Sequence, residues 1–115
     1  MDPRVSDDRI PLVRNDTGPQ IRLELTDTST GQRINLSGAT ALLYFRAVGT
    51  TQVLVTRPLV IPGSTATDGV ALIVWGEGDL DHPGGSYEGE VEVVLQNGVR
   101  QTVFEPVKFR LREDF

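Results

Sequence analysis

Alternation of apolar and polar side chains is the sequence feature that most constrains how this chain folds. From Tyr87 to Leu95 every second residue is apolar or glycine, while Glu88, Glu90 and Glu92 occupy positions between them. Successive side chains of a β-strand point to opposite faces, so a strand with one buried face has this period of two. No stretch of the chain has the helical period. The pattern therefore predicts an all-β fold.

The same alternation recurs along the chain and divides it into strands separated by turns. Asn97-Gly98 favours a tight hairpin turn. Pro106 interrupts the last strand and indicates an edge position or a bulge, because proline cannot donate to a strand ladder. About seven strands with this spacing predict an immunoglobulin-like antiparallel β-sandwich, with an eight-stranded jelly roll or a small barrel as alternatives. The segments expected to form these seven strands are 10–13, 20–26, 39–47, 52–57, 70–75, 87–96 and 99–111, the last interrupted at Pro106.

Length bounds the number of domains. The 115 residues suit one hydrophobic core, so we expect a single sandwich domain over residues 1–115, with residues 1–9 as an extended N-terminal arm. No segment approaches the roughly 20 apolar residues that cross a bilayer, so no membrane span is expected. The start of the chain also lacks the apolar core of a secretory signal.

Composition and charge exclude several function classes. The absence of cysteine excludes disulfides and thiolate metal sites, and it suits a reducing cytoplasm. With 16 acidic and 11 basic residues the net charge is −5, which disfavours nucleic acid as a partner. One small basic group near the C-terminus is interpreted as the solvated face of a strand, and it consists of Arg100, Lys108, Arg110 and Arg112.

Catalytic chemistry finds no support in the sequence. His82 is the only histidine, and it lies in a loop rich in turn-forming residues. A general base there would need a nucleophile or an acid held beside it. Gly85-Ser86-Tyr87-Glu88-Gly89 does not have the spacing of a nucleophile elbow. We therefore expect no enzyme, no catalytic residue and no cofactor.

Three carboxylates occupy alternate positions of the same loop, at Glu77, Asp79 and Asp81. Oxygen ligands at such a spacing can hold calcium, but the complete calcium-loop pattern with its later glutamate is missing. Aspartate also forms turns by bonding to nearby backbone. The interpretation is turn formation, with no metal site predicted and calcium binding kept as an alternative.

Two aromatic residues are expected to have structural roles. Gly85-Ser86-Tyr87 resembles the corner of Greek-key sandwiches, in which a tyrosine hydroxyl bonds back to upstream backbone. Trp75 ends an apolar run, so it is expected in the core rather than on a carbohydrate-binding surface.

Short motifs in a fixed order carry a family resemblance from about residue 15 to residue 111. They are Asn15-Asp16-Thr17-Gly18-Pro19, Ile34-Asn35-Leu36-Ser37-Gly38-Ala39-Thr40, Asp68-Gly69-Val70, Gly78-Asp79-Leu80 and Gly85-Ser86-Tyr87-Glu88-Gly89-Glu90-Val91-Glu92. In this order they resemble the N-terminal immunoglobulin-like domain of phage baseplate upper proteins and similar tail and fibre domains. The resemblance implies a structural virion protein, assembled in the host cytoplasm, that packs on a hub or tube and anchors fibres. It implies no catalytic residues.

The resemblance also implies partners and a location. We expect other virion proteins of the tail, baseplate, fibre or capsid as partners, a homo-oligomer within the particle, and location in the virion. A capsid decoration or head-fibre protein is one alternative, and a calcium- or carbohydrate-binding module for host attachment is another. The predicted protein-contact residues lie outside the core rhythm, and they are Arg4, Val5, Arg9, Ile10, Arg112 and Phe115.

Overall fold

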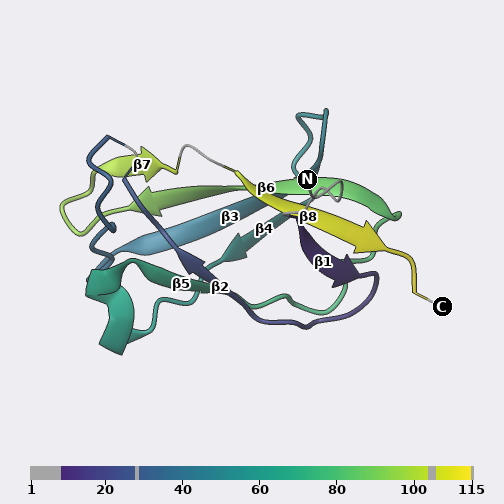
Figure 1. Cartoon of the computed structure of the whole chain (residues 1–115), viewed down its shortest axis with the longest axis horizontal. Helices are drawn as coiled ribbons and strands as arrows, with labels where there is room; N and C mark the ends of the chain where they lie inside the picture. Colours follow the sequence, from purple (N-terminus) through teal and green to yellow (C-terminus); the bar gives the residue numbers. More distant parts are fainter. Residues whose placement is uncertain (1–8, 28, 104–105, 115) are drawn as a thin grey trace, which may run out of the picture.

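Two β-sheets packed face to face form the structure, a computed structural model that describes residues 9–27, 29–103 and 106–114 (Figure 1). The large sheet has the strand order β1 (Ile10–Val13), β8 (Val107–Arg112), β6 (Gly85–Val94), β3 (Thr40–Ala47) and β4 (Val55–Pro58), and β7 (Arg100–Thr102) also pairs with β6. The small sheet contains β2 (Ile21–Glu24) and β5 (Val70–Ile73). A 3₁₀ helix, η1 (Gly63–Asp68), precedes β5. In the described residues no helix has the length and apolarity needed to cross a membrane.

This arrangement confirms the predicted immunoglobulin-like β-sandwich. The strand pairs of the described residues are antiparallel except for β1 and β8, which run parallel with Ile10 opposite Phe109. The predicted alternation is visible in β6, where Tyr87, Gly89 and Val91 are buried and the residues between them are more exposed. The buried face of each strand therefore points into the space between the two sheets.

The last predicted strand is divided into β7 and β8, which both pair with β6. Thr102 lies opposite Glu92 and Val107 lies opposite Gly89, so the chain advances five residues (102 to 107) against three on β6 (92 to 89). Pro106 thus marks a bulge-like interruption between β7 and β8, and it lies before the part of β8, Phe109–Arg112, that pairs with β1.

An aromatic cluster forms the centre of the core. Phe45 and Phe109 have no exposed surface, and Trp75 is only 3% exposed. The Phe45 ring packs edge-on against Trp75 at a centroid distance of 5.3 Å, and it stacks on Tyr87 at 5.0 Å. Such ring pairs add to the stabilisation from apolar burial. The prediction that Trp75 is a core residue is confirmed.

Tyr87 forms the predicted corner at the start of β6. Its hydroxyl donates a hydrogen bond to the carbonyl oxygen of Pro83 at 2.5 Å. Burial raises the pKa of Tyr87, so the hydroxyl stays protonated and remains a donor. The loop that precedes β6 is therefore fastened to the strand that follows it.

Gly69 joins η1 to β5 where backbone segments approach closely. Its φ angle of 74° lies in the left-handed region, and a Cβ at this position would lie 2.7 Å from the carbonyl oxygen of Leu25 and 3.0 Å from that of Ile34. The Leu25 N–H donates to the Gly69 carbonyl oxygen at 2.8 Å. The end of β2 is thus held against the start of β5 at a position that favours glycine.

Candidate protein-binding seam

Ion pairs organise the acidic loop between β5 and β6. The Asp79 carboxylate accepts hydrogen bonds from Arg57 Nε at 2.9 Å and from a loop backbone N–H at 2.7 Å. Asp81 forms an ion pair with Arg14 at 3.0 Å, and Glu77 is exposed. Within the described ranges, no three His, Cys, Asp or Glu side chains lie close enough to hold a metal ion. Arginines from distant parts of the chain thus pair with two of the three carboxylates considered as calcium ligands, Asp79 and Asp81.

His82 is half-buried and packs beside aromatic rings. Its ring centroid lies 6.5 Å from that of Phe45 and 6.4 Å from that of Tyr87. In the part of the chain that the structure describes, the imidazole makes no side-chain hydrogen bond. A packing role accounts for this position, and the absence of enzymatic activity stays a prediction.

The predicted contact residues have different surroundings. Arg4, Val5 and Phe115 lie outside the described residues. Arg112 is exposed at the end of β8, where its Nη1 donates to the backbone carbonyl oxygen of Glu113 at 3.2 Å. Its role in protein contact stays a prediction.

Arg9 and Ile10 lie against the large sheet. The Arg9 guanidinium donates a hydrogen bond to Ser86 Oγ of β6. Ile10 is the first residue of β1 and packs, partly buried, against the core. Arg112 lies opposite Val13 at the other end of β1, so these predicted contact residues are not brought together.

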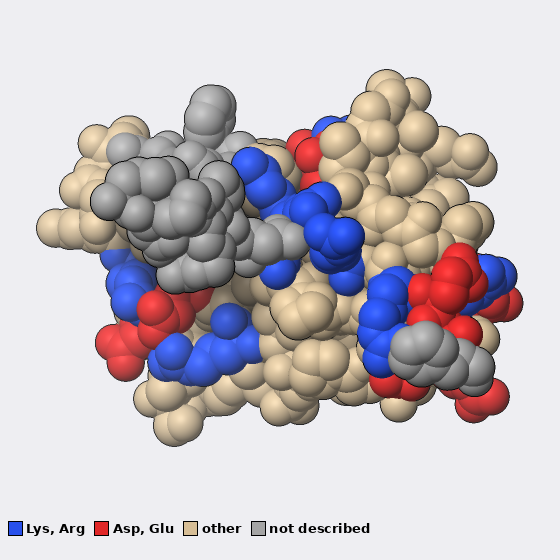
Figure 2. All heavy atoms as spheres, turned by 45° about the vertical axis from the view of Figure 1, so that its right-hand side comes forward, with Lys and Arg blue, Asp and Glu red and all other residues tan. Residues whose placement is uncertain are grey.

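Basic side chains gather in a band across one face of the molecule (Figure 2). Lys108, Arg110 and Arg112 are exposed at alternate positions of β8, in agreement with their interpretation as a solvated strand face. On the neighbouring β6, Glu88 lies opposite Lys108 and forms an ion pair with Arg46 at 2.9 Å. Opposite charges on adjacent strands stabilise the sheet across its ladder.

The outer edges of the large sheet carry residues that discourage further pairing. β1 contains Pro11 and β4 ends at Pro58, and neither proline has a backbone N–H to donate. Arg57 of β4 pairs with Asp79, with Nη2 2.6 Å from the carboxylate oxygen. Proline and charged side chains on edge strands protect natural sheets from pairing with other chains. These two edges are therefore poor templates for an added strand.

The free edge of β2, unlike those of β1 and β4, contains no proline. The Leu25 N–H donates to the Gly69 carbonyl oxygen at 2.8 Å, and because backbone groups alternate in direction along an antiparallel ladder, the odd-numbered residues of β2 face β5. The N–H and C=O groups of Arg22, Glu24 and Thr26 consequently point away from β5. Among the described residues, no strand pairs with this edge.

β7 presents a second free edge. The Val103 N–H donates to the Val91 carbonyl oxygen at 2.9 Å, and Thr102 lies opposite Glu92. By the same alternation, the backbone groups of Arg100 and Thr102 point away from β6. In the part of the chain that is described, β7 pairs with β6 alone.

An apolar groove of about 240 Å³ lies between the free edge of β2 and the residues on either side of the break between β7 and β8. Leu23 and Leu25 line it from the β2 side, Val103 and Val107 from the β7 and β8 side, and Val91 from β6. Leu23 and Val91 are buried, whereas Val103 and Val107 are half-buried and pack against the core. We call this groove, together with the free edges of β2 and β7, the seam. At the seam, apolar side chains lie next to backbone N–H and C=O groups that pair with no strand of the described residues.

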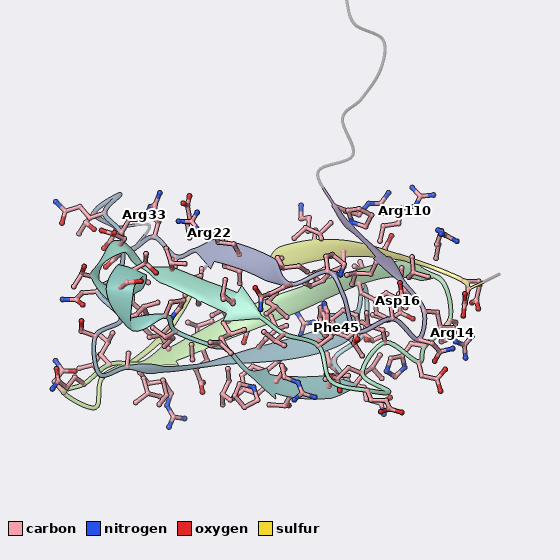
Figure 3. All side chains as sticks on the ribbon, turned by 90° about the horizontal axis from the view of Figure 1, so that it is seen from below. Arg14, Asp16, Arg22, Arg33, Phe45 and Arg110 are labelled. Carbon is pink, nitrogen blue, oxygen red and sulfur yellow. The ribbon has the colours of Figure 1, made fainter. Side chains whose placement is uncertain are left out.

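A charged triad lies beside the seam on the outer side of β2, where Figure 3 shows Arg22 and Arg33 pointing away from the core residue Phe45. The Glu24 carboxylate pairs with Arg22 at 2.5 Å and with Arg33 at 3.0 Å. The hydrogen bond from Arg22 and the charge of Arg33 lower the pKa of Glu24, so this carboxyl is ionised at neutral pH. Two guanidinium groups and one carboxylate leave the triad with one net positive charge.

Sequence reasoning did not identify the seam. It predicted β2 as a strand with Leu23 and Leu25 on its buried face, but alternation does not show which strand lies opposite. One sequence signal that could have indicated the seam was Pro106. It interrupts the last strand and so separates β7 from β8 at the place where the groove lies.

Comparisons with known proteins do not place the chain in a family. No protein-family model matches it, and no curated protein matches it either. Among solved structures it is similar to one titled "The crystal structure of CopC from Methylosinus trichosporium OB3b", at 11% sequence identity and a TM-score of 0.49, over 95% of this chain and 88% of that chain.

These findings correct the expected family. No protein-family model matches the chain, those of phage tail and baseplate proteins included, and no curated protein of that kind matches it. The predicted resemblance to phage baseplate upper proteins is therefore wrong. The virion function, its capsid and host-attachment alternatives and the virion location depended on that resemblance, and these predictions are wrong with it.

The motifs that carried the resemblance serve the sandwich fold itself. Gly69 allows a left-handed turn at a close backbone approach, and Tyr87 forms the corner before β6. Gly89 packs against the core residue Leu43, and a Cβ at this position would be 2.6 Å from Leu43 Cδ1. Unrelated sandwiches need similar residues at similar places, so the order of these motifs indicates a fold and not a family.

Proposed function

We propose that this chain is a non-enzymatic binding domain that attaches to another protein chain at the seam. The observation that supports the proposal is the coincidence of the unpaired edge of β2 with an apolar groove. Unpaired N–H and C=O groups on a strand edge are a template for a strand of another chain. Apolar side chains of that strand would enter the groove, and burial of apolar surface contributes about 25 cal/mol per Å².

The protected edges strengthen this proposal. Pro11 in β1 and Pro58 in β4 discourage pairing at both outer edges of the large sheet, while β2 and β7 contain no proline. An edge that is free of proline and lies beside apolar surface suits a site that is covered when a partner binds.

A matched pair of proline variants tests the proposal. Glu24→Pro removes a backbone N–H that points into the seam. Thr56→Pro is the control on β4: the Leu59 N–H donates to the Ala41 carbonyl oxygen at 2.9 Å, so the Thr56 N–H points outward, away from β3. Random peptides displayed on yeast are sorted for binding to the purified domain, and the enriched peptides are measured against both variants. Circular dichroism checks that each variant is folded.

We expect enriched peptides to bind Glu24→Pro about tenfold more weakly, which corresponds to about 1.4 kcal/mol, and to bind Thr56→Pro unchanged. Val107→Lys, which places a charge at the half-buried wall of the groove, should weaken the same peptides and serves if Glu24→Pro does not fold. Failure to enrich any binder, or equal binding to seam and control variants, would contradict the proposal.

A further inference from the structure

We infer that the seam takes an extended segment of a partner protein that adds antiparallel to β2, with small apolar side chains at every second position and an acidic side chain between them. The inference rests on the proposed function and specifies its ligand. It follows from the length of the free ladder on β2, the shape of the groove and the charge beside it.

β2 offers a longer ladder than β7. Its outward backbone groups at Arg22, Glu24 and Thr26 recur at every second residue. Beyond the strand, the Ile34 N–H donates to the Leu25 carbonyl oxygen at 2.9 Å, so the hairpin that follows β2 leaves the Thr26 groups free. β7 has only three residues, and its ladder with β6 is interrupted before β8. A continuous added strand therefore pairs with β2.

The groove selects the side chains of the added strand. Leu23 and Leu25 face it from β2, so alternate side chains of a neighbouring strand on the same face point into it. Its volume is about 240 Å³. That space suits side chains of valine size. The side chains between them face outward, beside the triad of Arg22, Glu24 and Arg33.

Direction and charge follow from pairing rules. Antiparallel ladders are slightly more stable per residue than parallel ones, and β2 already pairs antiparallel with β5. The net positive charge of the triad favours a carboxylate on the outward face of the added strand. Because exposed cross-strand ion pairs contribute little, the expected preference for an acidic over a basic residue is about two- to fivefold in affinity.

Fluorescence anisotropy with a synthetic peptide tests these features. The probe is a labelled nine-residue peptide with valine at alternate positions, threonine between them and one central outward glutamate. We expect N-methylation of the amides that face β2 to weaken binding more than tenfold, and N-methylation of the other amides to leave binding unchanged. A peptide of the same composition with consecutive valines should bind more than tenfold more weakly. Replacing the glutamate with lysine should weaken binding two- to fivefold, and Arg22→Glu should reverse that preference.

Photo-crosslinking measures the direction of the added strand. A benzophenone at the N-terminus of the peptide should crosslink near Thr26, and one at the C-terminus should crosslink near Ile21. The reverse pattern, or equal loss on methylation of either set of amides, overturns the inference.

If library peptides are sensitive to Glu24→Pro while the alternating peptide does not bind, the inference is wrong and the proposed function stands. If neither the library peptides nor the alternating peptide is sensitive to Glu24→Pro, both the inference and the proposed function are wrong. A dimer of the domain that the peptide dissociates would show that a second copy occupies the seam, and would also overturn the inference.

Discussion

Replacing Gly69 with alanine separates the cost of a left-handed backbone from the cost of a steric clash. Gly69 and Gly49 both have positive φ angles, of 74° and 85°, where a side chain costs roughly 1–2 kcal/mol. At Gly49 a Cβ would meet nothing within 4 Å, so Gly49→Ala should lower the free energy of unfolding by about that amount. At Gly69 a Cβ would lie 2.7 Å from the Leu25 carbonyl oxygen. Overpacking of this kind adds about 1–3 kcal/mol, which gives a total loss of about 2–5 kcal/mol.

Urea denaturation provides the measurement, with Trp75 as the reporter because it is the sole tryptophan and is 3% exposed. For slopes of about 1–3 kcal/mol/M, the midpoint of Gly69→Ala should lie about 1 M below that of Gly49→Ala. Leu25 also lines the seam, so Gly69→Ala should weaken binding of the alternating peptide while Gly49→Ala does not. Equal loss of stability in the two variants would refute the close approach of β2 and β5.

Three further predictions test the corner, the acidic loop and an ion pair near the end of β8. Tyr87→Phe should lose about 0.5–1.5 kcal/mol in urea denaturation, as expected for one hydrogen bond, and an unchanged midpoint would contradict the corner bond. Asp79→Asn should lower the melting temperature equally in calcium and in chelator, because its carboxylate binds an arginine; a calcium-dependent difference would contradict this role. The Gly84 N–H, followed by Arg14, lowers the pKa of Glu113. The stability that this group contributes is therefore present above its ordinary pKa and is lost as the pH falls through the folded value. Glu113→Gln should flatten the acid limb of a thermal stability profile, and an unchanged limb would argue against the assignment.

The strands were predictable because their pattern is local. Segment 10–13 matches β1 and segment 39–47 contains β3. The segment predicted to start at residue 52 becomes strand β4 only at Val55, and Val53 is 45% exposed. The segment predicted to end at Trp75 leaves the sheet after Ile73, because Trp75 packs into the aromatic cluster. The alternation of apolar and polar residues shows which face of a strand is buried. Where the strand begins and ends depends on the strands that pair with it.

The candidate site was less predictable because it depends on contacts between distant segments of the chain. Spacing alone made Asp79 and Asp81 resemble calcium ligands, yet Arg57 and Arg14 pair with them in the fold. The seam likewise brings Leu23 and Leu25 of β2 beside Val103 and Val107, which lie about 80 residues later in the chain. A short stretch of sequence does not show which distant residues will contact it. The carboxylates were therefore interpreted as ligands without the arginines that pair with them.

The parallel pairing of β1 with β8 has a mechanical consequence. A force that pulls the chain apart through the residues before Ile10 and after Arg112 acts in opposite directions along two adjacent strands. The backbone bonds between them are then loaded in shear and share the load, whereas an antiparallel hairpin pulled from its open end would break its hydrogen bonds singly, in sequence. A domain linked on both sides of this ladder would resist extension until β1 and β8 slide past each other as a unit.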